Sequence, residues 1–225
     1  RSGLMEDHPA RMVEVLRDSG ALARLLPELD RLWGVPQRAE YHPEIDTGVH
    51  VMMVLDMAAR LNASLAVRYA CLGHDLGKGT TPADMLPRHL GHEERSVRLL
   101  RGVGERLRVP NDCRELADVV AREHGNIHQS LGFGAAAVLR LLERLDAFRK
   151  PARLDDILLA CECDARGRLG LDRHLPAAAV RRPGAVLAVR HQPGADPGAP
   201  PAAGHVAAGP VARRRAGPQS PGRGT

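Results

Sequence analysis

The chain has 225 residues, a formal net charge of +5 and only five aromatic residues. This length is enough for one ordinary domain or two small ones with a substantial buried core. The four cysteines form no CxxC pair, and we find no signal peptide and no long apolar run. Composition therefore indicates neither a disulfide framework, a zinc knuckle nor a membrane protein, and favours a cytoplasmic one.

Helices are the elements expected throughout the first 172 residues, because apolar residues recur at steps of three and four and no segment keeps a strand-like alternation. We therefore predict an all-α fold. In chain order the expected helices are 9–18, 22–33, 47–61, 65–76, 92–107, 113–124, 135–148 and 153–166.

Several ends of these helices have a physical cause. Ser64 and Asn111 are expected to cap the helices that follow them, and Pro151 stands where a new helix begins. Gly77 and Gly79 are expected to stop the helix before them, which leaves 77–91 as a long loop. Long ordered loops in compact domains are often functional.

The segment 173–225 differs abruptly from the rest. It carries nine of the 17 prolines, and its eight arginines against one acid, Asp196, give it a charge of +7, which leaves −2 for the body. Such a Pro-, Gly-, Ala- and Arg-rich composition is typical of disorder. It fits either a shifted reading frame or a genuine basic arm that touches RNA. We accordingly divide the chain into a helical neck (1–40), a helical domain (41–172) and a disordered tail (173–225).

Metal-ligating side chains stand on helix faces that should be buried. His50 shares a stripe with Val54, and the corresponding stripes of three other helices carry His74, His124 and Asp164. A lone histidine on an apolar face is more often an ordinary core residue. Four such positions on four helices, with Asp75 directly after His74, favour a metal site instead.

The mixture of imidazole and carboxylate ligands suits Mn, Co, Ni, Fe or Zn better than calcium, and Mg remains open if water completes its shell. Because neighbouring helical residues project about 100° apart, His74 and Asp75 flank one metal or bridge two. A soft-metal site at Cys161 and Cys163 is the alternative, although both thiols fit a role as small apolar residues.

The order His50, His74-Asp75 and a distant Asp164 resembles the H…HD…D signature of the HD superfamily of metal-dependent phosphohydrolases. This resemblance implies that the all-α fold is an HD-type helical bundle. Four strings are similar to the HD domain of bacterial CCA-adding enzymes (tRNA nucleotidyltransferases) over roughly residues 5–172. They are YHPEIDTGVH (41–50), CLGHDLGKGTTP (71–82), LPRHLGHEERS (86–96) and REHGNIHQ (122–129).

The resemblance implies roles for individual residues. His50, His74, Asp75 and Asp164 would hold a divalent metal ion (Mg, Mn, Ni or Co), and Asp75 would also orient a water. His92 and His124 would be further ligands or phosphate contacts. Lys78, and less strongly Arg122, would meet a substrate phosphate, with a solvated surface charge as the alternative for each.

Other polar residues near these strings are weaker candidates. A break at Gly125 and Asn126 is expected to separate His128 from His124, and His42 and His89 are expected to lie exposed in loops. Trp33, at the end of an apolar helix, is expected to pack in the core rather than stack on a base.

The resemblance implies 2′,3′-cyclic phosphodiesterase, 2′-nucleotidase and phosphatase activity in tRNA 3′-end processing or repair. The partners would be a tRNA 3′ end, or 2′,3′-cyclic or 2′-phosphorylated nucleotides. We find no strand-borne Gly-Ser segment with paired aspartates, so the nucleotidyltransferase domain is expected to be missing and the chain should not add nucleotides. The alternatives are a tRNA-binding helical fragment with a non-catalytic metal site and, less favoured, another HD-type hydrolase acting on nucleotides or alarmones.

Overall fold

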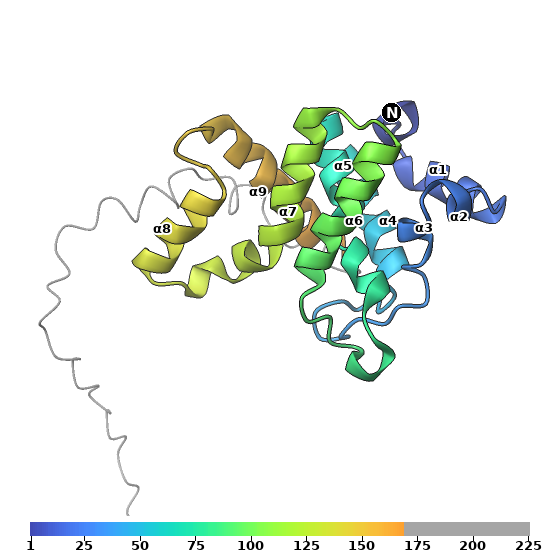
Figure 1. Ribbon diagram of the computed structural model, residues 1–225, viewed down its shortest axis with the longest axis horizontal. Coiled ribbons are helices and arrows are strands. Elements are labelled where there is room, and N and C mark those ends of the chain that lie inside the picture. The colour runs from blue at the N-terminus through green and yellow to red at the C-terminus, as the bar shows by residue number, and fades with distance from the viewer. Residues whose placement is uncertain (169–225) are drawn as a thin grey trace, which may run out of the picture.

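The computed structural model describes residues 1–168, and its regular elements are all helices (Figure 1). No strand occurs in these residues, and the only pairing of that kind is an isolated bridge between Pro36 and Asp46. The all-α prediction is therefore confirmed. The α-helices are α1 (Pro9–Asp18), α2 (Leu22–Leu25), α3 (Pro27–Asp30), α4 (Thr47–Arg60), α5 (Leu65–Gly73), α6 (His92–Arg106), α7 (Asn111–Gln129), α8 (Ala135–Arg144) and α9 (Pro151–Arg166). Short 3-10 helices are η1 (Ser2–Met5), η2 (Leu76–Thr80), η3 (Ala83–Met85) and η4 (Ser130–Gly132).

Helix α5 lies at the centre of the bundle, packed against α4, α7 and α9 (Figure 1). Helix α6 covers α7 and η2, α1 packs against α4, and α8 lies at the far side from α1. The core between them is built from the apolar stripes of these helices, including Val54, Leu55, Val67, Leu116 and Ile157, each at most 3% exposed. Burial of these stripes is what places the polar residues sharing the same faces inside the protein.

Local chemistry explains where the central helices start. The Ser64 hydroxyl accepts a hydrogen bond from Val67 N, as predicted, and the Asp46 carboxylate caps α4 in the same way through Val49 N. Pro151 is the first residue of α9, also as predicted. The prediction for Asn111 was wrong: Pro110 occupies the cap position, so Asn111 is the first helical residue and its side chain caps nothing.

Two predicted helices have different lengths in the structure. The segment 22–33 is divided into α2 and α3 because Pro27 has no N–H for a continuing helix and Leu26 leaves the helical region (φ −138°). Helix α7 runs on to Gln129 through the predicted break at Gly125 and Asn126. A glycine inside a helix costs only about 1 kcal/mol, and packing of α7 against α5, α6 and α9 outweighs it.

The loop predicted for 77–91 is partly ordered into η2 and η3, and α5 ends at Gly73 rather than at residue 76. Gly77 is needed here, because a Cβ at this position would lie 2.1 Å from the carbonyl oxygen of His92. This close approach lets η2 pack directly on the start of α6.

Within residues 1–168, no helix is long and apolar enough to cross a membrane. The segment 173–225, predicted to be a disordered tail, lies outside the described residues. The divisions at residues 40 and 172 stay predictions.

Candidate metal centre

Histidine and aspartate side chains from α4, α5, α7 and α9 converge at the middle of the bundle. His50 and His74 are buried on α4 and at the end of α5, His124 on α7 and Asp164 on α9, as their apolar stripes predict. Asp75 follows α5 directly, and its side chain is 1% exposed. We divide the cluster into an inner group (His50, His74 and Asp164) and an outer group (Asp75, His92 and His124).

The inner group is held by short contacts between residues far apart in the chain. His50 Nε2 lies 3.0 Å from Asp164 Oδ1, and His74 Nε2 lies 3.8 Å from the same oxygen. The three side chains are at most 6% exposed. Their ligand atoms all lie within 4.8 Å of one another, a spacing that can hold one metal ion.

The outer group is joined to the inner one through the two oxygens of Asp75. Oδ1 lies 3.3 Å from His92 Nε2 and 3.7 Å from His124 Nε2. Oδ2 lies 3.2 Å from His74 Nε2 and 3.9 Å from His50 Nε2. One carboxylate thus faces both groups, an arrangement typical of a ligand that bridges two metal ions.

The histidines present their Nε2 atoms to the cluster because their other ring nitrogens are occupied. Nδ1 of His74 lies 2.8 Å from Cys71 O, Nδ1 of His92 lies 2.8 Å from His89 O, and Nδ1 of His124 lies 3.1 Å from the carbonyl oxygens of Val120 and Ala121. A carbonyl only accepts, so each Nδ1 carries the proton and each Nε2 keeps a lone pair when the ring is neutral. Such second contacts fix the tautomer that a metal ligand requires.

The fit of the cluster to a metal ion rests on atoms that lack hydrogen bonds. His74 Nε2 and Asp75 Oδ1 are buried, and although they lie 3.2 Å and 3.3 Å from an ionisable neighbour, neither makes a well-aligned hydrogen bond within residues 1–168. Buried polar atoms are normally satisfied, and an unmatched carboxylate oxygen next to imidazole lone pairs is costly unless a cation lies between them. Two imidazoles and one carboxylate in each group suit Mn, Co, Ni or Zn, and Mg if water completes its shell.

Burial and neighbouring charges shift the pKa values of the cluster in different directions. Burial would raise the pKa of Asp75, but the charges of His74 and Lys78 outweigh it and hold that pKa well below the usual range. Burial would lower the pKa of His74, but Asp75 and Asp164 raise it to about 9. Burial lowers the pKa of His124 to about 3, against the attraction of Asp75. A proton on His74 therefore offsets part of the negative charge of Asp75 and Asp164.

Lys78 lies beside the cluster, in η2. Its Nζ is 2.8 Å from Asp75 Oδ2 and 2.5 Å from Gln37 Oε1, and its side chain is 8% exposed. A solvated surface lysine, the alternative considered from the sequence, is therefore wrong. The lysine is held with its charge at the edge of the outer group.

Sequence reasoning missed the carboxylate behind His50. Glu44 Oε1 lies 2.9 Å from His50 Nδ1 and 3.1 Å from His42 Nδ1, and the Glu44 side chain is 2% exposed. Burial would raise the pKa of Glu44, but hydrogen bonds from the two histidines hold it well below its usual range. No periodic pattern marks Glu44, because it lies in the irregular segment before α4.

Three histidines lie in environments different from those predicted. Burial lowers the pKa values of His42 and His89, and His89 contacts both Thr81 Oγ1 and Pro36 O, so neither ring is simply exposed. His128 Nε2 lies 2.6 Å from Asp164 Oδ2 because α7 continues past Gly125. His128, which is partly exposed, thus contacts Asp164 of the inner group from the surface side of the protein.

Arg122 does not join the cluster. Its Nε lies 3.2 Å from Glu94 Oε1 on the outer face of α6 and α7. Arg122 does not border the hollow beside the outer group, so the geometry does not support the predicted contact with a substrate phosphate.

A hollow of about 390 Å³ opens beside the outer group. It is bordered by Lys78 and His92 together with residues of the segments 37–42 and 87–93 and Gln129. Its volume is within the range of small-molecule pockets, roughly 300 to 1,000 Å³. The outer group is therefore the part of the cluster that a ligand can reach.

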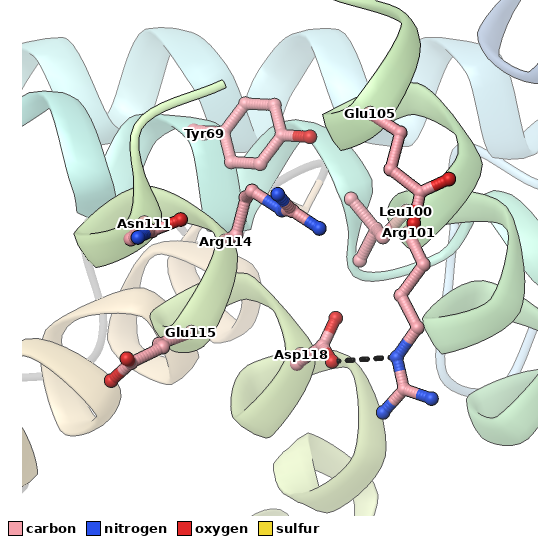
Figure 2. Close-up of a pocket in the computed structure, with 8 residues that line it drawn as sticks. All are labelled: Tyr69, Leu100, Arg101, Glu105, Asn111, Arg114, Glu115 and Asp118. Carbon is pink, nitrogen blue, oxygen red and sulfur yellow. Dashed lines mark hydrogen bonds and ion pairs between the residues drawn. The ribbon is translucent and has the colours of Figure 1, made fainter. Parts of the chain in front are cut away.

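A second hollow, of about 370 Å³, lies between α5, α6 and α7 and shares no residue with the cluster (Figure 2). Arg101 and Asp118 form an ion pair of 3.0 Å across it, and the buried Tyr69 hydroxyl has no hydrogen-bond partner in the described part of the chain. Its acids outnumber its basic residues, and it contains no histidine or cysteine. We do not assign metal chemistry to it.

All four cysteines are buried and free. Burial raises the pKa of the Cys161 thiol well above its usual range, and a hydrogen bond with Cys163 together with burial does the same for Cys71. Within residues 1–168 no cysteine belongs to a group that could hold a metal ion. This supports the apolar role predicted for Cys161 and Cys163. Trp33 packs against the core beside Gly48, also as predicted.

Comparison with known proteins gives one family match and a set of relatives. The family model described as "HD domain" matches residues 47–165. A "Multifunctional CCA protein" of Acidovorax sp. (strain JS42) is 76% identical over 175 residues, covering 77% of this chain and 41% of the relative. One of Paracidovorax citrulli (strain AAC00-1) is 69% identical over 217 residues, 96% of this chain and 50% of the relative. One of Polaromonas naphthalenivorans (strain CJ2) is 73% identical over 171 residues, 76% and 40% respectively. The chain thus spans about half or less of the length of these relatives.

Proposed function

The chain belongs to the HD domain family, and from that premise we propose that it is a metal-dependent phosphohydrolase acting on 2′,3′-cyclic phosphates and 2′-phosphates. The observation that carries the proposal is the position of Asp75. Its buried carboxylate faces two histidine groups, and its Oδ1 atom makes no well-aligned hydrogen bond among the described residues. This arrangement supports a bound divalent cation.

The proposed roles of the residues differ with their position in the cluster. His50, His74 and Asp164 would hold a metal ion in the inner group, and His92 and His124 would hold one in the outer group, with Asp75 between them. A divalent metal ion supplies a more acidic bound water and offsets negative charge on phosphoryl oxygens. Lys78, with its Nζ atom between Asp75 and Gln37 and its side chain bordering the hollow, would bind a phosphate oxygen.

The substrate class rests on the relatives. Their name, "Multifunctional CCA protein", agrees with the resemblance of the sequence to the HD domain of bacterial CCA-adding enzymes, which implies a tRNA 3′ end as the substrate. We propose that the phosphate removed or opened is at the 3′ end of an RNA, where an open hollow can accept a chain terminus. Nucleotide addition is not proposed for this chain.

Hydrolysis assays test this proposal. The purified protein is stripped of metal, resupplied with Mg, Mn, Co, Ni or Zn, and assayed on 2′,3′-cyclic AMP and on 2′-AMP. We expect turnover that needs metal and is lost in a His74→Ala/Asp75→Ala double variant. Absence of turnover with every metal, in protein shown to be folded by circular dichroism, would overturn the hydrolase proposal. Binding of tRNA by that inactive protein would favour the tRNA-binding fragment instead.

A further inference from the structure

The hollow beside the outer group is larger than a phosphate group requires. Lys78 and His92 are only two of the residues that border its volume of about 390 Å³. The remaining border includes Arg38 and Arg88, two exposed arginines for which no ion-pair partner exists in residues 1–168. Unpaired guanidinium groups around an opening favour a ligand with more than one anionic group.

Tyr41 lies at the mouth of this hollow with 59% of its surface exposed. Its segment is anchored on both sides to the metal-ligating cluster. Its carbonyl oxygen accepts a hydrogen bond of 3.2 Å from Arg168, whose guanidinium lies 3.5 Å from Asp164 Oδ1. On the other side, Glu44 contacts His50. An exposed aromatic ring held in this way presents a face on which a nucleobase can stack.

Gln37 supplies an unused hydrogen-bond donor at the floor of the same hollow. The residue is 3% exposed, and its Oε1 accepts from Lys78 Nζ. A lysine only donates, so the amide oxygen must face it and the amide nitrogen must face elsewhere. This Nε2 atom is buried and has no hydrogen-bond partner among the described residues. A ligand that accepts a hydrogen bond would satisfy it.

We propose that Tyr41, Gln37, Arg38 and Arg88 form a nucleotide-recognition site at the mouth of the metal centre. Tyr41 stacks on the base of the terminal nucleotide, and Gln37 donates to its base or ribose. Arg38 and Arg88 bind the phosphate that links this nucleotide to the preceding one. This inference rests on the proposed function, which places the reacting phosphate at the metal centre. The additional contacts to the base and to the linking phosphate would let the protein distinguish an RNA end from a simple phosphate ester.

Equilibrium binding tests the site independently of turnover. Calorimetry compares 2′-AMP with inorganic phosphate on the Mn-loaded protein, on Tyr41→Ala and on Tyr41→Phe. We expect 2′-AMP to bind about 5- to 150-fold more tightly than phosphate, the range that stacking of one base on an aromatic ring gives. Tyr41→Ala should remove most of this difference, whereas Tyr41→Phe should keep it. Equal affinities for the two ligands, or no change in Tyr41→Ala, would overturn the proposal.

The arginines are tested with a dinucleotide that ends in a 2′-phosphate. Arg38→Ala/Arg88→Ala should weaken its binding more than that of 2′-AMP and reduce its dependence on salt, as loss of phosphate contacts requires. Arg98→Ala is the control, because Arg98 is an exposed arginine of α6 that does not border the hollow. Equal losses for the mononucleotide and the dinucleotide would contradict the assignment of the arginines.

Turnover separates a failure of this inference from a failure of the proposed function. If the proposed function holds, Tyr41→Ala loses more kcat/KM on 2′,3′-cyclic AMP than on glycerol 2-phosphate, a phosphate monoester without an aromatic ring. A protein that hydrolyses neither substrate but discriminates 2′-AMP through Tyr41 would contradict the hydrolase and leave the nucleotide site supported. Equal losses of kcat/KM on both substrates in Tyr41→Ala would overturn the nucleotide site.

Discussion

The inner and outer groups of the metal centre share the Asp75 carboxylate but differ in what surrounds them. His50, His74 and Asp164 come from three helices of the core, and their side chains are at most 6% exposed. In the outer group the His92 side chain is 15% exposed and borders the hollow. We therefore propose that the inner group holds its metal ion more firmly, and that the outer group meets the substrate through His92.

The largest expected effect comes from neutralising the inner carboxylate. Asp164→Asn removes the charge that faces His50, His128 and Arg168, so metal affinity should fall by more than the roughly 10–100-fold typical of changes outside the ligand shell. Metal content after dialysis, measured by plasma mass spectrometry, checks this. Asp155→Asn, an exposed carboxylate on the same helix, should keep its metal. Retained metal in Asp164→Asn would remove the distinction between the groups.

Changing the outer group should impair turnover more than the retention of metal. His92→Gln leaves the inner contacts in place, so one metal ion should stay bound. Loss of cation stabilisation at the substrate side, worth several kcal/mol, should lower kcat by about 100-fold or more. Steady-state kinetics with measured metal content distinguish the two effects, with His8→Gln, an exposed histidine before α1, as the control. A complete loss of metal would show that the two groups form one undivided site.

An intermediate effect is expected behind the inner group. Glu44→Gln weakens the contact to His50 Nδ1 without removing a ligand, so metal affinity should fall by about 10–100-fold. Glu40→Gln is the matched control, because Glu40 is exposed in the same segment. Metal titration by calorimetry measures both variants. An unchanged affinity in Glu44→Gln would mean that the orientation of His50 is fixed by core packing alone.

The smallest perturbation is a pH titration of the metal-free protein by NMR. The pKa of His74 is raised to about 9, so its ring should stay charged at pH 7, and its contribution to stability should be lost as pH rises from about 6.5 to 9. The pKa of His124 is lowered to about 3, so its ring should stay neutral, and its contribution should be lost as pH falls from 6.5 toward 3. Similar pKa values for the two rings would contradict the contrast between the groups.

Helical periodicity in the sequence was sufficient to predict which side chains of the four helices are buried together at the site. His50, His74, His124 and Asp164 share stripes with apolar residues, and burial of those stripes brings the four side chains together. The chemical roles of these residues stay predictions until metal is measured.

Contacts from irregular segments could not be predicted in this way. Gln37 and Glu44 reach the site from the segment between α3 and α4, where side-chain direction follows turns rather than a period. The sequence predicted that His128 lies apart from His124, because Gly125 indicated a helix end. Tertiary packing instead continues α7 to Gln129. The prediction of a single helix over 22–33 was wrong, although Pro27, which divides the segment, is visible in the sequence.

The most direct test of the metal centre is anomalous X-ray scattering from crystals soaked in Mn or Co. We expect a peak beside the Asp75 carboxylate, within reach of the Nε2 atoms of the inner group, and a second one near His92 and His124 at higher metal concentration. A peak only among His42, Glu44 and His50, which also lie close enough to hold an ion, or no peak near Asp75 at all, would contradict the account.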